Sequence, residues 1–374
     1  MSSEVEFNPC LATLPVYQPG RPIEEVAREL GLEPGSIIKL ASNENPLGPS
    51  RRAVAAMRNA LGKAHLYPDG SAFHLKQKLA THLGVTPSNL VLGNGSNEVL
   101  EMVGHAMLRP GTGAVVSQYC FAVYPIVTAL SGAALTVVPA RNHGHDLDAM
   151  LAAIRDDTRV VFVANPNNPT GTTASPAQLE SFIQAVPSHV LIVLDEAYIE
   201  FLDGALDLLP GIRDGSRPNL LLVRTFSKIH GLAGIRLGYG IGHPDLIAQL
   251  EKVREPFNVN AVAQAGAVAA LDDQSHAART RKNNQRGLKL YSKTLKKLGL
   301  EYVPSTANFV LVRVGDGLKV FSGLQKLGVI TRPMAGYQLP EWIRISIGTS
   351  EENERCLAAL TQVLGLNLSG TKVP

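Results

Sequence analysis

Polar residues gather directly after three apolar runs of the sequence. NPNNPTG (165–171) follows RVVFVA, DEAY (195–198) follows VLIVL, and FSKIHGLAGIRLGY (226–239) follows NLLLVRT. Short unbroken runs of Val, Leu and Ile are typical of strands that are buried on both faces of a parallel sheet. The carboxyl ends of such strands line the crevice where ligands bind in open α/β sheets. The spacing therefore predicts one site that collects amide, carboxylate and amine side chains from three loops.

Each of these clusters has a simpler explanation when it is considered alone. Lys228 fits a solvated surface position, Asp195 fits a cap for the following helix, and NPNNPTG fits a tight turn. The three clusters together favour a functional site, because all three strands would deliver their polar residues to the same crevice. A protein without a ligand-binding site would not be expected to place polar clusters after three neighbouring strands.

Apolar runs and helical patterns alternate along the first two thirds of the chain, which predicts an α/β fold. We expect a large domain over residues 41–260, with a mostly parallel sheet sandwiched by helices. The expected strands lie at residues 89–93, 113–117, 134–139, 159–164, 190–198 and 219–227. The expected helices lie at residues 50–61, 73–83, from the NGSNE loop to about 107, 123–130, 146–154 and 175–186.

The pattern changes after residue 260. A long helical stretch (261–299) is followed by further strand-like segments, and together they predict a small α+β domain over residues 261–374. These segments lie at residues 307–314, 328–334 and 342–348. Residues 1–40 are rich in Pro and Gly and predict an arm with one helix (23–30) that packs on the small domain.

The composition is typical of a soluble globular protein, with 45% hydrophobic and 18% charged residues among 374 and a formal net charge of +3. Lys293, Lys296 and Lys297 are spaced as on a solvated helix face rather than in a nucleic-acid patch. The chain has three widely separated cysteines, and its N-terminus lacks the pattern of a signal peptide. No apolar run is long enough to cross a bilayer. We therefore expect a cytoplasmic protein with neither a membrane nor a nucleic acid as partner.

The segment NHGHD (142–146) has a spacing of His and Asp that could suit a metal ion. It precedes a predicted helix, and Asp146 is a good N-cap for that helix. We therefore favour a loop over a metal site, and we expect no metal.

A series of motifs along the chain resembles a known family. The resemblance is to fold-type I pyridoxal-phosphate aminotransferases, most closely to histidinol-phosphate aminotransferases, and it covers nearly the whole chain. The motifs, in the family's order, are SNENPLGPS, YPDG, GNGSNE, FAVYP, NPNNPTG, DEAY, FSKIHGLAGIRLGYG, PFNVN and IRISIGT. The resemblance implies a large domain that binds pyridoxal 5'-phosphate and a small domain completed by the N-terminal arm.

The resemblance implies roles for the residues around the cofactor ring. Lys228 would provide the amine that forms a Schiff base and later moves a proton. Asp195 would keep the pyridine nitrogen protonated, while Tyr198 and Asn168 would hold the phenolic oxygen as an anion. Phe121 would stack on the ring. We take Lys228, Asp195 and Tyr198 as the catalytic residues.

The cofactor's phosphate needs backbone amides and cations. The GNGSNE loop leads into a helix, whose N-terminus offers free N–H groups and a favourable dipole. By the resemblance, Tyr67 would reach the phosphate of a neighbouring subunit in a homodimer. The other phosphate-binding residues that the resemblance implies are Ser96, Asn97, Thr225, Ser227 and Arg236.

The substrate-binding residues follow from the same resemblance. Arg344 would bind the substrate's α-carboxylate with two hydrogen bonds, with Asn168 nearby. Arg332 and Tyr17 would lie near the far end of the substrate, where histidinol phosphate carries its phosphate. An arginine at a strand edge is as often merely solvated, so both interpretations of Arg332 stay open.

The reaction that the resemblance implies is reversible transfer of an amino group between L-histidinol phosphate and 2-oxoglutarate, which gives imidazole acetol phosphate and glutamate. A broad aromatic amino-acid aminotransferase and a threonine-phosphate decarboxylase are alternatives on the same fold. A non-catalytic binding module is a further alternative. The presence of Lys228, Asp195, Tyr198, Asn168 and Arg236 together argues against that last one.

Overall fold

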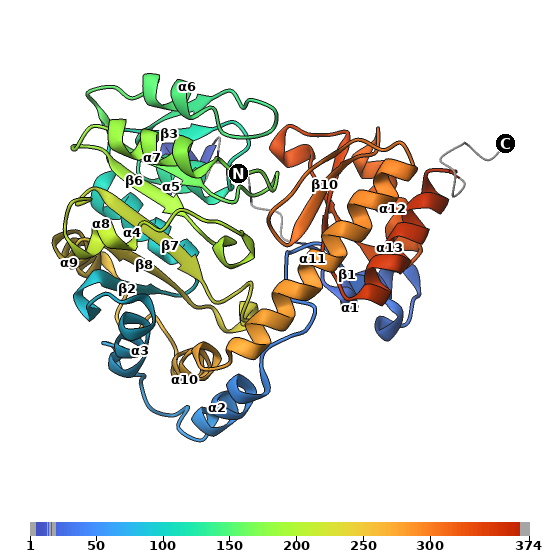
Figure 1. Cartoon of the computed structure of the whole chain (residues 1–374), viewed down its shortest axis with the longest axis horizontal. Coiled ribbons are helices and arrows are strands. Elements are labelled where there is room, and N and C mark those ends of the chain that lie inside the picture. The colour runs from blue at the N-terminus through green and yellow to red at the C-terminus, as the bar shows by residue number, and fades with distance from the viewer. Residues whose placement is uncertain (1–4, 13, 15, 17–19, 367–374) are drawn as a thin grey trace.

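A seven-stranded sheet forms the centre of the larger part of the molecule (Figure 1). The computed structural model describes residues 5–12, 14, 16 and 20–366. The strand order is β2-β8-β7-β6-β5-β3-β4, and only β8 runs antiparallel to its neighbours. The predicted mostly parallel sheet is therefore confirmed. The strands are β2 (Leu90–Gly93), β3 (Gly113–Ser117), β4 (Ala134–Val138), β5 (Thr158–Ala164), β6 (Leu191–Asp195), β7 (Leu220–Thr225) and β8 (Gly238–Gly242).

Helices cover both faces of this sheet, because alternate strand residues point to opposite sides. In β5, Val161 and Val163 pack into one core, and Val160 and Phe162 pack into the other. The first core is closed by α2 (Arg51–Leu61), α3 (Phe73–Leu83), α6 (Leu147–Ala152), α7 (Pro176–Ala185), α8 (Leu209–Arg213) and α10 (Ala261–Leu271). The second is closed by α4 (Ser96–Met107), α5 (Val123–Leu130) and α9 (Pro244–Val253).

Local capping residues explain where several of these helices begin. The Ser50 side chain accepts a hydrogen bond from the Ala53 N–H and caps α2. Ser175 forms a capping box with Gln178 at the start of α7, and Pro176 occupies the first turn. Such caps each stabilise a helix by about 1 kcal/mol. These helix starts agree with those predicted from the sequence.

The C-terminal part forms a smaller sheet domain, drawn in orange and red in Figure 1. An antiparallel sheet of order β12-β13-β10-β9 packs against three helices. These strands are β9 (Tyr302–Val303), β10 (Phe309–Arg313), β12 (Arg332–Pro333) and β13 (Trp342–Ser346). The helices are α11 (Gln274–Lys297), α12 (Gly317–Lys326) and α13 (Ser350–Val363).

The N-terminal segment packs on this small domain, as predicted. Strand β1 (Ile38–Lys39) pairs in parallel with β11 (Val329–Ile330). Helix α1 (Ile23–Leu30) places Val26 in a core with Ile330. Residues 23–39 and 274–363 thus share one folded unit, although they lie far apart along the chain.

The long helical stretch predicted over 261–299 is two helices. Asp273 interrupts it, and its side chain accepts a hydrogen bond from the His276 N–H at the start of α11. Helix α10 packs against α2 and α3, and its Ala263 and Ala267 lie in the core of the large sheet. The division at residue 260 stays a prediction, and this packing favours a division after Leu271.

Strand β8 was not predicted, because its sequence GYGIG is rich in glycine, which is unfavourable in strands. The expected strands 190–198 and 219–227 are shorter in the structure and end at Asp195 and Thr225. Lys228 and Tyr198 therefore lie on loops beyond the carboxyl ends of the sheet. Among the described residues, no helix is both long enough and apolar enough to span a membrane.

Candidate active site

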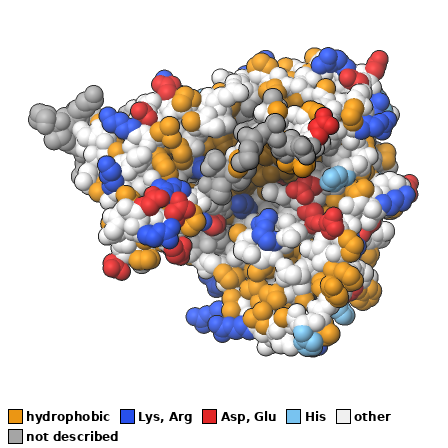
Figure 2. All heavy atoms as spheres, turned by 180° about the vertical axis from the view of Figure 1, so that it is seen from behind, with side chains coloured by type: hydrophobic (Ala, Val, Ile, Leu, Met, Phe, Trp, Pro, Cys, Tyr) orange, Lys and Arg blue, Asp and Glu red, His pale blue; other side chains and the backbone are white. Residues whose placement is uncertain are grey.

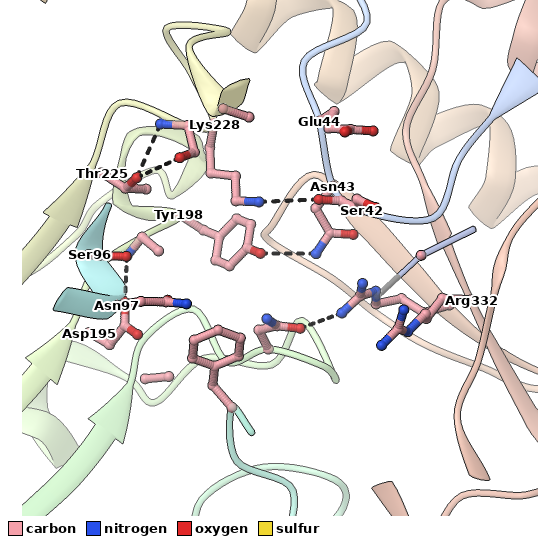
Figure 3. A pocket seen from close by; sticks show the side chains of 18 of the residues that line it. Ser42, Asn43, Glu44, Ser96, Asn97, Asp195, Tyr198, Thr225, Lys228 and Arg332 are labelled. Carbon is pink, nitrogen blue, oxygen red and sulfur yellow. Dashed lines mark hydrogen bonds between the residues drawn. The ribbon is translucent and has the colours of Figure 1, made fainter. Parts of the chain in front are cut away.

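A cavity of about 360 Å³ opens at the carboxyl ends of β5, β6 and β7, between the sheet and the small domain (Figure 3). It brings together residues from every motif predicted to follow a strand. Of the predicted site residues, those lining the cavity are Ser96, Asn97, Phe121, Asn168, Asp195, Tyr198, Thr225, Ser227, Lys228, Arg236, Arg332 and Arg344.

Two predicted residues are not placed in this cavity. Tyr67 lies elsewhere, with 83% of its surface exposed, and its ring stacks on Phe257 with centroids 4.7 Å apart. Tyr17 lies outside the described residues, so its role near the substrate stays a prediction.

The Lys228 side chain points into the cavity from the loop after β7 (Figure 3). Its Nζ donates a hydrogen bond to the backbone oxygen of Ser42 at 3.2 Å and lies 5.5 Å from the centre of the Tyr198 ring. Burial raises the pKa of Tyr198 to about 12. The phenol therefore carries its hydrogen at neutral pH and can donate a hydrogen bond.

Asp195 ends β6 and is 94% buried, since only 6% of its surface is exposed. Its Oδ2 accepts a hydrogen bond from the Tyr124 hydroxyl at 2.7 Å, and its Oδ1 accepts one from the Ala197 N–H at 3.0 Å. Burial raises the pKa of Asp195, and these two hydrogen bonds oppose the increase. The carboxylate is thus held in a fixed orientation by neutral donors.

The N-terminus of α4 forms one end of the cavity. Gly95 has a φ of 83°, and a side chain at this position would collide with the Arg236 guanidinium. A Cβ at Gly238 would collide with the backbone of Ser96. The two glycines therefore let the arginine and the free N–H groups of the helix approach one another, which creates a pocket for an anion.

Thr225 and Ser227 add hydroxyl groups beside this pocket. The Ser227 N–H donates to Thr225 Oγ1 at 3.1 Å, and the Thr225 hydroxyl donates to Ser227 Oγ at 3.0 Å. Both residues are buried. This pairing holds the turn between β7 and Lys228 in place.

Two arginines lie at the small-domain side of the cavity. Arg332 in β12 and Arg344 in β13 are directly opposite each other in the antiparallel register. Arg344 Nη1 donates to the Asn168 side-chain oxygen at 2.5 Å, and its Nη2 donates to the Ala41 backbone oxygen at 3.0 Å. Like charges that face each other across a strand pair are destabilising. Because two positive charges lie side by side at the cavity, the two arginines suit an anionic ligand.

The cavity residues missed in the sequence include three that lie in quoted motifs and contact predicted site residues. Tyr124 of FAVYP binds Asp195, while Ser42 and Asn43 of SNENPLGPS contact Lys228 and Tyr198. Tyr124 is fully buried, and its ring stacks on Phe162. Their position in the motifs is the only signal that the sequence offered, because their partners lie far away along the chain.

The NHGHD segment forms a loop, as favoured from the sequence. Asp146 caps α6 by accepting a hydrogen bond from the Ala149 N–H. His143 stacks on Tyr119, and His145 contacts the Ala164 backbone oxygen at 2.9 Å. Packing therefore accounts for both histidines.

Comparison with known proteins identifies the family. The family model described as aminotransferase class I and II matches residues 35–360. The chain belongs to this family. The resemblance seen in the motifs is therefore confirmed.

Several relatives of this aminotransferase carry a more specific name. Histidinol-phosphate aminotransferase 1 of Thiobacillus denitrificans is 54% identical over 362 residues, which are 95% of this chain and 94% of that protein. Histidinol-phosphate aminotransferase of Akkermansia muciniphila is 49% identical and covers 97% of this chain and 100% of its own. The histidinol-phosphate aminotransferase of Sinorhizobium meliloti, solved in complex with pyridoxal-5'-phosphate, superposes with a TM-score of 0.88. It is 31% identical, and the match covers 97% of this chain and 98% of that one.

The groups around the cavity of this aminotransferase fit pyridoxal phosphate. The bare backbone at Gly95 and Gly238 leaves room for a phosphate beside Arg236, where side chains would fill the pocket. Asp195 supplies a buried carboxylate for a ring nitrogen. Phe121 lines the cavity and offers a flat face.

Proposed function

We propose that this aminotransferase transfers an amino group between L-histidinol phosphate and 2-oxoglutarate, with pyridoxal phosphate as cofactor. The direct register of Arg332 and Arg344 at the cavity carries this proposal. A phosphate ester has two negative charges near neutral pH, and guanidinium groups bind such anions with paired hydrogen bonds. Two adjacent arginines therefore suit a phosphorylated substrate, and one of them suffices for the α-carboxylate of glutamate.

The proposed roles of the other residues follow from their chemistry. When bound, pyridoxal phosphate supplies a ring that withdraws electrons from the carbon bearing the amino group. Lys228 holds the cofactor through its amine and then moves the proton at the substrate's α-carbon. Asp195 holds a proton on the ring nitrogen. Tyr198 and Asn168 donate hydrogen bonds to the phenolic oxygen.

Absorption spectra of half-reactions test the substrate. Purified protein loaded with pyridoxal phosphate is mixed separately with histidinol phosphate, glutamate and phenylalanine, and the visible band of the cofactor is followed. We expect histidinol phosphate and glutamate to change the band, and phenylalanine to react more slowly. A response to phenylalanine without one to histidinol phosphate would favour an aromatic aminotransferase. Release of CO₂ from threonine phosphate would favour the decarboxylase, and failure to take up the cofactor would contradict catalysis with pyridoxal phosphate.

A pair of arginine variants tests the phosphate site. Arg332→Gln should raise the KM for histidinol phosphate by about 10- to 100-fold, because a hydrogen bond to a charged group is lost. The KM for glutamate should rise less. Arg313→Gln is the matched control, since Arg313 lies in the same sheet but is paired with Glu301 and Glu341 at the surface. Equal effects of the two variants would contradict the assignment.

The proposal includes a homodimer in which Tyr67 completes the partner's site. Figure 2 shows hydrophobic side chains gathered on the lower part of its face, where α2 and α3 lie. Exposed apolar patches of this kind are typical of subunit interfaces. The exposed large hydrophobic residues in and near α2 and α3 include Leu61 (57%), Leu66 (58%), Tyr67 (83%), Phe73 (56%) and Phe257 (47%).

Mixing two impaired chains tests the shared site. A chain with Tyr67→Phe and a chain with Lys228→Ala are unfolded, mixed and refolded together. If Tyr67 serves the partner, each heterodimer has one site with neither change and one with both. We expect the mixture to bind pyridoxal phosphate more tightly than the Tyr67→Phe homodimer. Affinity equal to the average of the two parents, or a monomer in sedimentation, would contradict the proposal.

A cytoplasmic location is also part of this proposal. Cys120 and Cys356 are buried thiols, and burial raises the pKa of each to about 12. Unpaired cysteines persist in reducing compartments. Fractionation of cells that express the tagged protein would test this location.

A further inference from the structure

Residues 40–48, here called the crossing segment, run between the two domains along the wall of the cavity. On the small-domain side, the Ser346 N–H donates to the Leu40 oxygen at 2.9 Å. On the large-domain side, Asn45 Nδ2 donates to the Ile229 oxygen at 3.0 Å, one residue after Lys228. The crossing segment is therefore anchored to both domains at the point where they meet.

Asn43 lies at the middle of this segment, and only 1% of its surface is exposed. Every polar group of the residue has a partner. Its N–H donates to Ser346 Oγ at 2.8 Å, and its Oδ1 accepts from the same hydroxyl at 3.1 Å. Its backbone oxygen accepts from Asn308 Nδ2 at 2.9 Å, and its own Nδ2 donates to Tyr198 Oη at 2.9 Å (Figure 3).

These hydrogen bonds have one mutually consistent set of directions. A backbone N–H can only donate, so Ser346 Oγ accepts from the Asn43 N–H, and the Ser346 hydroxyl in turn donates its own hydrogen to the Asn43 side-chain oxygen. That contact turns the amide nitrogen of Asn43 toward Tyr198. The phenol oxygen therefore accepts a hydrogen bond from Asn43, and its own hydrogen must point in another direction.

The cavity is the direction left for that hydrogen. The described residues give the Tyr198 hydroxyl no acceptor, and the ring lines the cavity. The opposite polarity, in which the phenol donates to Asn43, would turn this hydrogen away from the cavity. One amide thus decides whether the cavity contains a hydrogen-bond donor at this point.

We propose that Asn43 is a positioning residue that directs the hydroxyl hydrogen of Tyr198 into the cavity, and that Ser346 fixes the orientation of its amide. The inference rests on the proposed function, because the acceptor is the phenolic oxygen of pyridoxal phosphate. Asn43 has this effect through Tyr198. Ser346 and Asn308 belong to the small domain. Through their contacts with Asn43, the small domain therefore sets the direction of the hydrogen bond that Tyr198 of the large domain donates.

Asn43→Asp tests the proposal with little change of shape. The new carboxylate can only accept, so it takes the Tyr198 hydrogen and removes the donor from the cavity. The readout is the pH midpoint at which the visible absorption band of the protein-bound cofactor changes. We expect the midpoint to rise by about one to two pH units, the effect of losing one hydrogen bond to a charged oxygen. Tyr198→Phe should raise it by a similar amount.

The double variant separates hydrogen-bond direction from charge. A carboxylate near the cofactor raises the midpoint by its charge alone, and that effect would persist without the phenol. If Asn43 works through Tyr198, Asn43→Asp with Tyr198→Phe shifts the midpoint little beyond Tyr198→Phe alone. Additive shifts would overturn the proposal, and so would a wild-type midpoint in Asn43→Asp.

Two further variants test whether the shift of the midpoint is specific to Asn43 and to the orientation of its amide. Asn45→Asp changes another buried amide of the crossing segment that does not touch Tyr198, so its midpoint should stay at the wild-type value. Ser346→Ala removes the hydroxyl that orients Asn43 and should give part of the shift; a wild-type midpoint here would overturn the role of Ser346. Wild-type protein that takes up no cofactor would instead contradict the proposed function itself.

Discussion

Asp195 and Glu196 are neighbours at the end of β6, but their carboxylates lie in different surroundings. Asp195 faces the cavity and is held by two neutral donors, the Tyr124 hydroxyl and the Ala197 N–H. Glu196 is not a cavity residue, and the Oε2 of this buried carboxylate lies 2.7 Å from the Arg224 Nε in an ion pair with a largely buried arginine. The charge of Glu196 is therefore balanced within the chain. The charge of Asp195 is oriented for a cationic ligand.

This difference separates a region that maintains the fold from one that serves the reaction. A buried ion pair loses solvation on both sides, and removing one partner leaves the other charge uncompensated. A carboxylate that is held by neutral hydrogen-bond donors keeps its orientation without an ion-pair partner. We therefore expect substitutions beside Arg224 to affect stability and substitutions in the cavity to affect activity.

The largest expected effect is that of Lys228→Ala on activity. Loss of the amine should lower the rate of a single half-reaction by at least about 10²- to 10⁴-fold, because proton transfer loses its catalyst. The free energy of unfolding of the cofactor-free protein should change by only about 1 kcal/mol, the size of a hydrogen bond such as that to Ser42. Rapid-mixing absorbance and urea denaturation measure the two quantities. A large loss of stability would remove the contrast between the two regions.

Arg224→Met should have the opposite effect. It leaves Glu196 buried without its cation and should lower the free energy of unfolding by about 3–5 kcal/mol in urea denaturation. Adding Glu196→Leu to the same chain should restore much of this loss. Arg313→Met is the control, because Arg313 makes exposed ion pairs and its loss should cost under about 1 kcal/mol. A small effect of Arg224→Met would show that the ion pair does not maintain the fold.

Glu200 extends the ion-pair region and should make stability depend on pH. Its Oε2 is buried without a hydrogen-bond partner in the part of the chain that the structure describes. Burial raises its pKa to about 7 against the attraction of Arg224 and Arg281, and Glu196 adds repulsion. Because the folded-state pKa is raised, the stability due to this group is complete below about pH 4.5 and is lost as the pH rises through about 7.

The variant Glu200→Gln should remove this pH dependence. Urea denaturation of the cofactor-free protein should give equal stability for wild type and variant at the lowest pH that both tolerate. At pH 8 the variant should be more stable by at most about 3 kcal/mol. The same difference at both pH values would contradict a titrating carboxyl at this position.

The smallest expected effect is that of Tyr124→Phe. It removes one neutral donor from Asp195 and should lower the free energy of unfolding by about 1–2 kcal/mol. The affinity for pyridoxal phosphate should also fall, because the carboxylate loses its fixed orientation. Equilibrium titration with the cofactor measures this. A loss as large as that of Arg224→Met would mean that Asp195 also serves the fold.

The sequence predicted the parts of the site that lie within one motif. Asp195 and Lys228 directly follow apolar runs, so both the local pattern and the family resemblance pointed to them. Asn43 was missed because its role depends on Tyr198, 155 residues away, and on Ser346, 303 residues away. A contact across such a separation leaves no periodic signal in the chain.

The parts of the fold that could be predicted were likewise those whose signal lies within a short stretch of sequence. Buried runs and capping residues such as Ser50 and Ser175 identified most elements of the large domain. Strand β8 was missed because its glycines serve close packing against α4, a tertiary requirement that overrides strand preference. The place of α10 was missed because an alanine-rich helix suits either domain until its packing partners are known.

The crossing segment has a consequence for the order in which the molecule folds. The large domain can close its core with residues up to α10, but Asn43 waits for Asn308 and Ser346 near the end of the chain. Contacts between such distant residues form slowly, because a long loop must close first. Lys228 is thus in place early, while the part of the cavity wall formed by the crossing segment is completed last. Ribosome-bound chains that stop before β13 should already protect the large sheet from proteases and still leave the crossing segment open to cleavage.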